Sequence, residues 1–340
     1  MKVIALRLAA VLLVSCCIFS CKKEFVDTQS PTKLDEKTSV SITPTTIFAP
    51  GLHNFTDIHI CYDDKVFLLE GGKLKRLVGT DLVDVPLPAS VYKDFDPKFL
   101  TISKDFTFYL RANTGIKIIK SGKEIGYYKV GQAPLENFTP NTFGNFEIEV
   151  DETDHSLVFG TVRFGFDSTS YAIAKITKDG HYGDITFPNV VEQFITAFGL
   201  GPSTGEIWSG NLETNGNSYF DGLLKSTVST PPFTYGNTKL YGQHPSTHIS
   251  FPTEGPIDSV EFAVISGITV SKNSKVVYYK TGSFGEEEDV DGVNSFGNVF
   301  KIEDGIVKRL TENVDGKRLA ISNNGKTLYI AGKGLSKIEL

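Results

Sequence analysis

Short stretches of alternating apolar and polar residues recur along this chain, and the clearest one lies near its end. In Leu319–Ile330, the apolar positions Leu319 and Ile321 precede a polar segment, Ser322–Gly325, and a second apolar stretch, Leu328–Ile330, follows it. Alternation with a period of two predicts strands, and Asn-Gly favours the positive φ angles of a tight turn. The segment is therefore predicted to be a β-hairpin.

Five similar hairpins precede this one, and their spacing predicts the fold. They begin at Ile58, Leu100, Ile148, Phe198 and Ile268. The start-to-start intervals are 42, 48, 50, 70 and 51 residues. A third strand is predicted at 115–119, 170–176, 298–302 and 335–340, and a fourth at 126–130 and 306–310. Periods of about 40–50 residues are typical of propeller blades. The sequence thus predicts an all-β fold, a six-bladed β-propeller with four-stranded antiparallel blades.

The sixth unit ends before a fourth strand, so another segment must complete that blade. The alternating segment Ser39–Ile47 is the predicted donor, and its pairing would close the ring and remove an exposed sheet edge. The propeller is placed at residues 46–340. Its longest interval contains an insertion at about 228–262, rich in Pro and Thr, which is either a functional loop or the decorated edge of a blade.

The N-terminus has the pattern of an export signal. A basic start with Arg7 leads into an apolar run, Leu8–Phe19, which is too short to span a bilayer. The residues before Cys21 resemble the lipobox of bacterial lipoproteins, with Cys16 as the alternative. Residues 1–20 are therefore predicted to be a lipoprotein signal peptide, and 21–45 a tether that includes the closing strand. Lipidation of Cys21 would anchor the protein to the bacterial cell envelope, and the outer membrane is the predicted site, with the propeller facing either the periplasm or the cell surface.

Composition excludes one class of partner. The 340 residues carry a net charge of -6, and no basic stripe is present, so a nucleic-acid ligand is not expected. Three of the four cysteines lie in the N-terminal segment, which leaves Cys61 without a disulfide partner in the mature domain. Nothing near Cys61 would activate a thiol, so it is interpreted as a small, partly buried residue at a strand end.

A family resemblance supports the fold prediction. The hairpins Ser266–Tyr279 and Arg318–Ile330 resemble those of six-bladed propellers of the gluconolactonase-like and yellow/royal-jelly families, in the TolB-like group, and the ending Gly332–Leu340 is similar to that of the lactonases. The resemblance implies a divalent metal at the tunnel mouth, with ligand positions that fall on Ser266 and Thr281. Hydroxyl groups are weaker ligands for hard cations than carboxylates or amide carbonyls, so the residues do not favour a lactonase.

The same geometry predicts where a ligand would bind. Inner strands begin and second strands end on one face of the ring, which we call the mouth face. Seven residues are predicted to form a ligand-binding set there: Glu70, Arg111, Glu147, Arg163, Asn211, Lys280 and Arg318. Four of them are cations, and guanidinium groups suit carboxylate or phosphate. An anion-binding pocket is predicted, and the alternative is that each charge is solvated or pairs with Glu70 or Glu147.

One acidic segment partly matches a calcium loop. Glu287, Asp289 and Asp291 alternate before Gly292, but Asn298 stands where a bidentate Glu is needed. A solvated acidic loop explains the segment as well. The sequence therefore predicts no cofactor, with Ca²⁺ as the one alternative.

The sequence is compatible with three classes of function. The first is an extracytoplasmic, membrane-anchored module that binds a small ligand, a glycan or a surface protein. The second is a metal-dependent hydrolase or lactonase, and the third is a structural component of a surface complex that uses the insertion as its contact. The poor metal positions favour a binding module over an enzyme.

Overall fold

The computed structural model describes residues 41–143, 147–164, 169–185, 193–215, 218–227, 239–242, 254–282 and 297–340. The chain divides into two compact units, Met1–Ser39 and Val40–Leu340, and the described residues all belong to the second. The predicted signal peptide with Cys16 and Cys21, and the acidic segment with Glu287, Asp289 and Asp291, lie outside the described residues.

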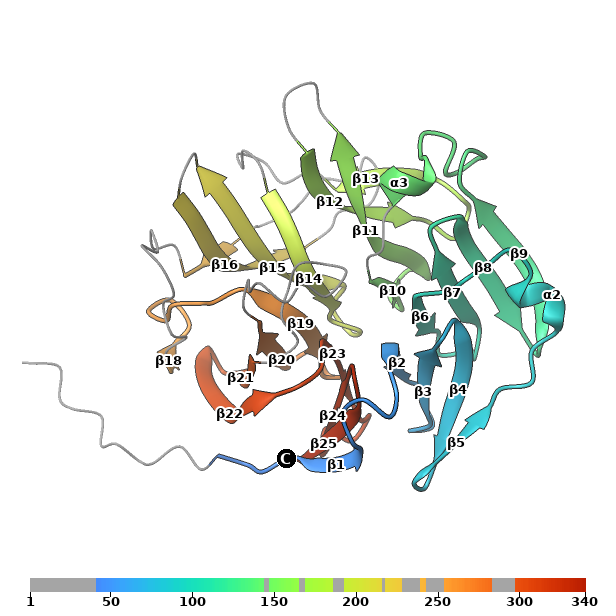
Figure 1. Cartoon of the computed structure of the whole chain (residues 1–340). Coiled ribbons are helices and arrows are strands. Elements are labelled where there is room, and N and C mark those ends of the chain that lie inside the picture. Colours follow the sequence, from blue (N-terminus) through green and yellow to red (C-terminus); the bar gives the residue numbers. More distant parts are fainter. Residues whose placement is uncertain are drawn as a thin grey trace, which may run out of the picture. The chain divides into compact units, whose positions relative to one another are not determined.

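The second unit is a ring of six antiparallel β-sheets, as the repeat predicted (Figure 1). In order round the ring, the blades are β2-β3-β4-β5, β6-β7-β8-β9, β10-β11-β12-β13, β14-β15-β16-β17, β19-β20-β21-β22-β18 and β23-β24-β25-β1. The strands are β1 (Thr45–Phe48), β2 (Phe55–Ile60), β3 (Val66–Glu70), β4 (Lys73–Val78), β5 (Asp81–Asp84), β6 (Phe99–Ile102), β7 (Phe108–Ala112), β8 (Gly115–Lys120), β9 (Lys123–Lys129), β10 (Ile148–Asp151), β11 (Ser156–Phe164), β12 (Thr169–Ile176), β13 (Tyr182–Ile185), β14 (Gln193–Leu200), β15 (Glu206–Asn215), β16 (Ser218–Thr227), β17 (Lys239–Tyr241), β18 (Gly255–Pro256), β19 (Ile265–Val270), β20 (Val276–Thr281), β21 (Gly297–Glu303), β22 (Ile306–Val314), β23 (Arg318–Ile321), β24 (Thr327–Ala331) and β25 (Leu335–Glu339). Two single-turn helices, α2 (Ala89–Tyr92) and α3 (Pro140–Phe143), lie in loops between blades.

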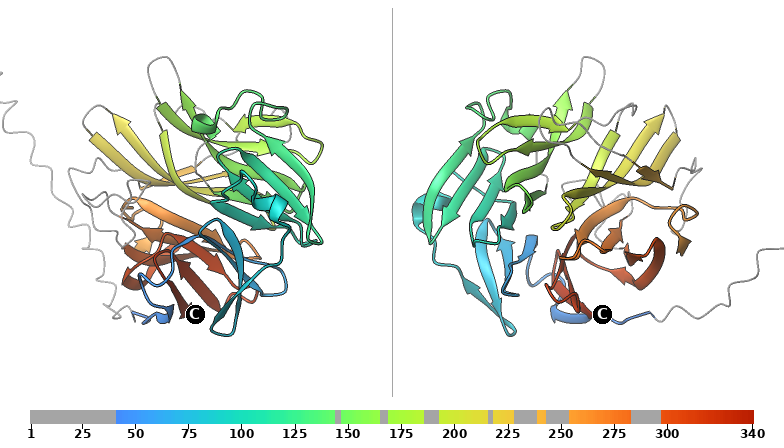
Figure 2. Two further views of the ribbon diagram at one scale, coloured as in Figure 1. Left: turned by 45° about the vertical axis from the view of Figure 1, so that its right-hand side comes forward. Right: turned by 180° about the vertical axis from the view of Figure 1, so that it is seen from behind.

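The first strand of each blade lies nearest the centre of the ring (Figures 1 and 2). Each of these inner strands contacts the inner strand of the blades on both sides, and β23 of the sixth blade contacts β2 of the first. The ring is therefore continuous around one central channel.

The ring is closed by an N-terminal strand, as predicted. Strand β1 completes the sixth blade by antiparallel pairing with β25, with Thr45 opposite Lys337 and Thr46 opposite Ser336. The C-terminus lies beside β1 in Figure 1. The paired residues lie at the C-terminal end of the predicted donor segment. Strand β1 pairs there with β25, which without it would be the outer edge of the sixth blade.

Parts of the insertion at 228–262 also pair with blades. Strand β17 forms the outer edge of the fourth blade, and β18 adds a short fifth strand to the next blade through Gly255 and Pro256. A proline at this position is compatible with an edge strand, because one side of an edge strand needs no N–H donor. These described parts of the insertion decorate blade edges.

The hydrophobic core is divided among the interfaces between blades. Within the described residues there are six buried clusters, and each one joins side chains of two neighbouring blades. Between the sixth and first blades, for example, Ala320 and Leu335 pack with Phe55 and Leu68. A four-stranded blade cannot bury its apolar faces alone, so the ring folds as one cooperative assembly.

A short polar motif shapes four of the six hairpin turns. A Ser or Cys ends the inner strand, and an Asp or Asn follows two residues later: Cys61 and Asp63, Ser103 and Asp105, Ser271 and Asn273, and Ser322 and Asn324. The thiol or hydroxyl donates to the second side chain at 2.5–2.9 Å. The same acceptor oxygen then receives the N–H of the residue two positions on, as in an Asx-turn. Cys61 thus takes the place of a turn serine, and burial raises the pKa of its thiol to about 12.

The fourth residue of this motif has a positive φ in all four turns. The angles are 60° at Asp64, 59° at Phe106, 57° at Ser274 and 71° at Gly325. Glycine adopts this conformation without steric cost, whereas a bulky side chain does not. Phe106 is also 43% exposed, so little packing compensates for its backbone conformation.

We expect Phe106→Gly to stabilise the protein. Glycine removes the steric cost of a positive φ at this position, but it also raises the conformational entropy of the unfolded chain. The first effect is the larger one, so the free energy of unfolding should rise by about 0.5–1 kcal/mol. Urea denaturation followed by tryptophan fluorescence measures the change. Phe106→Ala keeps the Cβ atom and is the control, and a gain as large in that variant would show that exposure of the ring, and not φ, is responsible.

Candidate functional site in the central channel

Residues of the inner strands line the central channel at successive depths. Near the mouth face, one layer contains Asp57, Phe99, Glu147 and Arg318, which come from four different blades. Two residues further along the strands, the next layer contains His59, Glu149, Thr269 and Ala320. This two-residue step follows from strand geometry, in which residues i and i+2 share a face.

Arg318 and Glu147 form a largely buried ion pair that spans the channel. Arg318 belongs to the sixth blade and Glu147 precedes the inner strand of the third, and each side chain is only 13% exposed. The Arg318 guanidinium lies 4.8 Å from the centre of the Phe99 ring, and its Nε donates to the carbonyl of Thr56 at 3.4 Å. Glu147 Oε2 accepts the N–H of Phe198 at 2.7 Å. Through this pair, groups from five blades are joined.

Asp57 performs a similar bridging role between the first two blades. Its Oδ1 accepts the N–H of Ile58 at 2.9 Å, and its Oδ2 accepts the N–H of Leu100 at 2.7 Å. Burial raises the pKa of Asp57 to about 7, although the nearby positive charge of Arg318 acts in the opposite direction. At the mouth end of the channel, the side chains of Asp57, Glu147 and Arg318 therefore all have hydrogen-bond partners.

Two of the predicted mouth-face cations, Arg111 and Lys280, are fully buried and donate to backbone carbonyls. Arg111 is fully buried, and its guanidinium donates to the carbonyls of Phe143, Glu147 and Gly160 at 2.5–3.0 Å. It lies 4.5 Å from the centre of the Phe143 ring, and burial lowers its pKa to about 9. Lys280 is also fully buried, with Nζ donating to the carbonyl of Thr281 at 3.2 Å, and burial lowers its pKa to about 7.

Of the predicted set, the structure brings Glu147 and Arg318 together, and the guanidinium of Arg111 reaches the backbone of Glu147. Glu70 instead lies 2.6 Å from Nδ1 of His53. Arg163 is placed in β11 and Asn211 in β15, and their side chains lie outside what the structure describes. A ligand-binding role for these seven residues stays a prediction. The direct Arg318–Glu147 pair corresponds to the alternative interpretation, in which mouth-face charges pair with each other.

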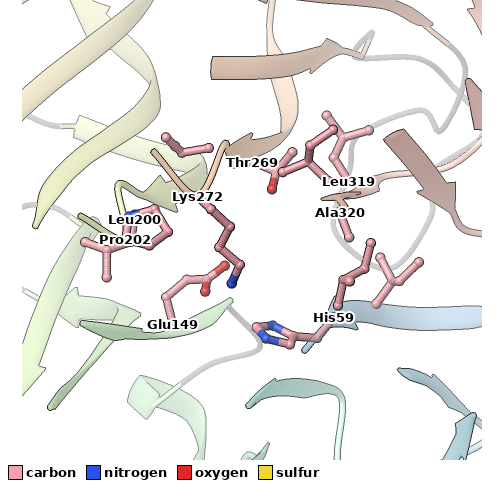
Figure 3. Close-up of a pocket in the computed structure, with 12 residues that line it drawn as sticks. His59, Glu149, Leu200, Pro202, Thr269, Lys272, Leu319 and Ala320 are labelled. Atoms are coloured by element: carbon pink, nitrogen blue, oxygen red, sulfur yellow. The ribbon is translucent and has the colours of Figure 1, made fainter. Parts of the chain in front are cut away.

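Beyond the ion pair, the channel contains a cavity of about 60 Å³. Its walls are residues of the inner strands and hairpin turns of five blades, and Leu200, Pro202, Leu319 and Ala320 supply apolar surface (Figure 3). A volume of this size holds a few water-sized groups. The cavity is therefore suited to a small ligand.

Three titratable side chains from three blades converge on this cavity (Figure 3). Nε2 of His59 is buried and has no hydrogen-bond partner, and the nearby backbone of Ile102 only partly opposes the effect of burial on the pKa of the ring. Burial lowers the pKa of His59 to about 3, so the imidazole is neutral. Burial raises the pKa of Glu149 to about 8 and lowers that of Lys272.

Lys272 lies at the other end of the cavity, on the face of the ring that carries the hairpin turns. Its Nζ is 3.8 Å from the centre of the Tyr62 ring, so the side chain reaches from the fifth blade to the first. Sequence reasoning missed His59, Glu149 and Lys272. The strand alternation carries the signal, since His59 and Glu149 lie two residues after Asp57 and Glu147, whereas the predicted mouth-face set contains residues near strand ends.

The metal positions implied by the lactonase resemblance do not fit a divalent cation. Ser266 Oγ donates to the carbonyl of Lys280 at 3.3 Å, and Thr281 Oγ1 accepts the N–H of Asn298 at 3.0 Å. Both side chains are buried hydroxyls engaged with backbone. In the part of the chain that the structure describes, no three His, Cys, Asp or Glu side chains gather as a metal site would require.

Comparisons with known proteins identify the architecture. The sequence matches no protein-family model, and no curated protein matches it. Among solved structures, a gluconolactonase from Xanthomonas campestris is similar with a TM-score of 0.56 and 9% identity over 87% of this chain and 88% of that one. An auxiliary nutrient binding protein from Bacteroides thetaiotaomicron has a TM-score of 0.55 and 9% identity, over 87% and 75% of the two chains. The WD40 repeats of RRP9 have a TM-score of 0.50 and 11% identity, over 88% and 100%. At these identities the likeness shows the fold alone, a β-propeller.

We expect Arg318→Met to destabilise the protein strongly. The substitution removes the guanidinium partner of Glu147 inside the channel, which should lower the free energy of unfolding by about 3–5 kcal/mol. In the double variant with Glu147→Leu, much of that loss should be recovered, because neither charge of the pair remains. Urea denaturation of both variants and of the Glu147→Leu single variant gives the coupling free energy, and additive losses would contradict the buried pair.

Proposed function

We propose that this propeller is a binding module that captures a small polar ligand in its central channel. The observation that carries the proposal is the cavity into which His59, Glu149 and Lys272 converge. A pocket with apolar walls and a few convergent polar groups is the usual form of a small-molecule site. The unpartnered Nε2 of His59 supports a ligand at this point, because a buried polar nitrogen without a partner is unfavourable.

The chemistry of the residues favours binding over lactone hydrolysis. The two positions that the lactonase resemblance implies as metal ligands carry hydroxyls bonded to backbone, and hard cations need oxygen ligands with charge or a strong dipole. The similar solved structures include one named as a gluconolactonase and one named as a nutrient binding protein. The channel of this chain fits the second kind of role.

We also propose that the module is displayed outside the cytoplasm on a lipid anchor at Cys21. The support is the sequence pattern of residues 1–21, a basic start, a short apolar run and a small residue before the cysteine. Among the residues that the structure describes, no helix has the length and apolar character needed to cross a bilayer. An acylated N-terminal cysteine followed by a polar tether would hold the propeller at the membrane surface.

Filling the cavity should abolish ligand binding. Thr269 lines the cavity, so Thr269→Phe should place a ring in it and remove the thermal shift produced by any small molecule that binds there. The measurement is a thermal-shift screen of small carboxylates, amines and sugars with the full-length protein. Thr80→Phe, at an exposed turn, is the control. Compounds that shift both variants and the unmodified protein equally bind elsewhere, and a screen in which no compound distinguishes Thr269→Phe from the unmodified protein would contradict the proposed function.

Replacing Cys21 should release the protein from the membrane. Cys21→Ala removes the acylation site, so the protein should move from the membrane fraction to the soluble extracytoplasmic fraction, and labelling with radioactive palmitate should be lost. Cys16→Ala is the matched control and should leave both unchanged. Loss of labelling in Cys16→Ala with retention in Cys21→Ala would place the lipid on the other cysteine.

A further inference from the structure

We propose that the channel cavity binds a small carboxylate, held between the ammonium group of Lys272 and the carboxyl group of Glu149. The inference rests on the proposed binding function and specifies its ligand class. It is carried by the placement of Lys272, Glu149 and His59, which reach one cavity from the fifth, third and first blades (Figure 3).

Lys272 brings a positive charge to the cavity. The groups around Lys272 stabilise this charge only in part. In the part of the chain that the structure describes, no ion pair joins its ammonium group to a carboxylate, and the group lies instead over the face of Tyr62 at 3.8 Å. An aromatic face attracts a cation through its quadrupole but does not neutralise it. A carboxylate in the cavity would provide the missing counter-charge with a charge-assisted hydrogen bond.

Glu149 faces an environment that favours its neutral form. The charged and titratable groups around it are Asp57 and Glu147 in the next layer, Lys272 and His59 across the cavity, and Tyr62 at the turn face. Burial, together with the negative charges of Asp57 and Glu147, opposes ionisation more strongly than Lys272 favours it. A neutral carboxyl group can donate a hydrogen bond, and a carboxylate is the strongest acceptor that a small ligand can offer.

The same arrangement disfavours a cationic ligand. An ammonium group in the cavity would lie beside the ammonium group of Lys272, and like charges at close range in a poorly solvated site repel strongly. To relieve the repulsion, Lys272 would have to leave the Tyr62 ring. A carboxylate needs no such rearrangement.

The remaining walls limit the size of the ligand and suggest a second polar contact. The cavity of about 60 Å³ and the apolar side chains of Leu319 and Ala320 suit a short carbon chain. Nε2 of His59 has no hydrogen-bond partner, and a hydroxyl group can either donate to this nitrogen or accept from it, whichever tautomer the neutral ring adopts. A carboxylate with an adjacent hydroxyl could satisfy this nitrogen, so glycolate should bind more tightly than acetate.

Binding of simple probes tests the ligand class. Saturation-transfer nuclear magnetic resonance with the full-length protein should show binding of acetate and glycolate at pH 7, and weaker binding of acetamide and ethylammonium. Lys272→Met keeps the length of the side chain without its charge and should weaken acetate binding by about 10- to 100-fold. Lys275→Met removes an exposed lysine from the same turn and should leave acetate binding unchanged.

The pH dependence tests the part assigned to Glu149. Its pKa is raised to about 8, so Glu149 is largely protonated at pH 7 and ionises above pH 8. Acetate affinity should therefore be highest below pH 8 and should fall about tenfold per pH unit above it, because an ionised Glu149 repels the ligand. Glu149→Gln keeps a neutral hydrogen-bond donor and should bind acetate at pH 7 without this decline near pH 8.

The possible results separate this inference from the proposed function. Binding of ethylammonium that depends on Glu149, without binding of acetate, would overturn the carboxylate ligand and leave a channel-binding module in place. Acetate binding that Lys272→Met and Lys275→Met weaken equally would also overturn it. Failure of every compound class to distinguish Thr269→Phe from the unmodified protein would overturn the proposed function itself.

Discussion

The ion pair between Arg318 and Glu147 is the constraint on which the centre of this propeller depends. The two residues come from opposite sides of the ring, and their contacts extend to Thr56, Phe99 and Phe198. Two charges in a poorly solvated channel are favourable only when they meet each other and their remaining hydrogen-bonding groups are satisfied. That requirement fixes how far apart the inner strands lie at the mouth face.

The outer parts of the ring are held by a different interaction. Apolar side chains fill the interfaces between blades, with one buried cluster at each interface among the described residues. The hairpin turns add polar links between neighbouring blades, such as the N–H of Asn323 donating to Asp64 at 2.8 Å and that of Lys104 donating to Glu152 at 2.6 Å. Hydrophobic packing therefore stabilises the wall of the ring, and polar contacts set its geometry at both faces.

The channel contains more carboxyl groups than cationic side chains. Asp57, Glu147 and Glu149 bring three carboxyl groups toward the axis, while Arg318 and Lys272 bring two cations. Arg318 forms an ion pair with Glu147, whereas Lys272 and Glu149 line the cavity together with the neutral His59. The cavity is therefore lined by one lysine, one carboxyl group whose pKa burial raises and one imidazole whose Nε2 has no partner. Its character follows from burial, which decides which of the groups carry charge.

Much of the fold was predictable from the sequence, because the signals are local. Alternation with a period of two identifies the strands, Asx residues and Gly325 identify the turns, and the interval between hairpins identifies the blades. The missing outer strand of the last blade identified the N-terminal segment as its partner. Each of these features depends on residues that are near in sequence or on a regular repeat.

The site depended on the tertiary structure. Glu147 and Arg318 are 171 residues apart, and no spacing rule indicates that their side chains meet across a channel. Arg111, which the sequence placed in the same set, turns between blades to bind backbone carbonyls. The sequence by itself determined the blade, its turns and the closure of the ring, because hydrogen bonding and apolar alternation act along the chain. Only the tertiary structure decided which charges are buried, paired or open to a ligand, because burial and distance arise when the blades assemble.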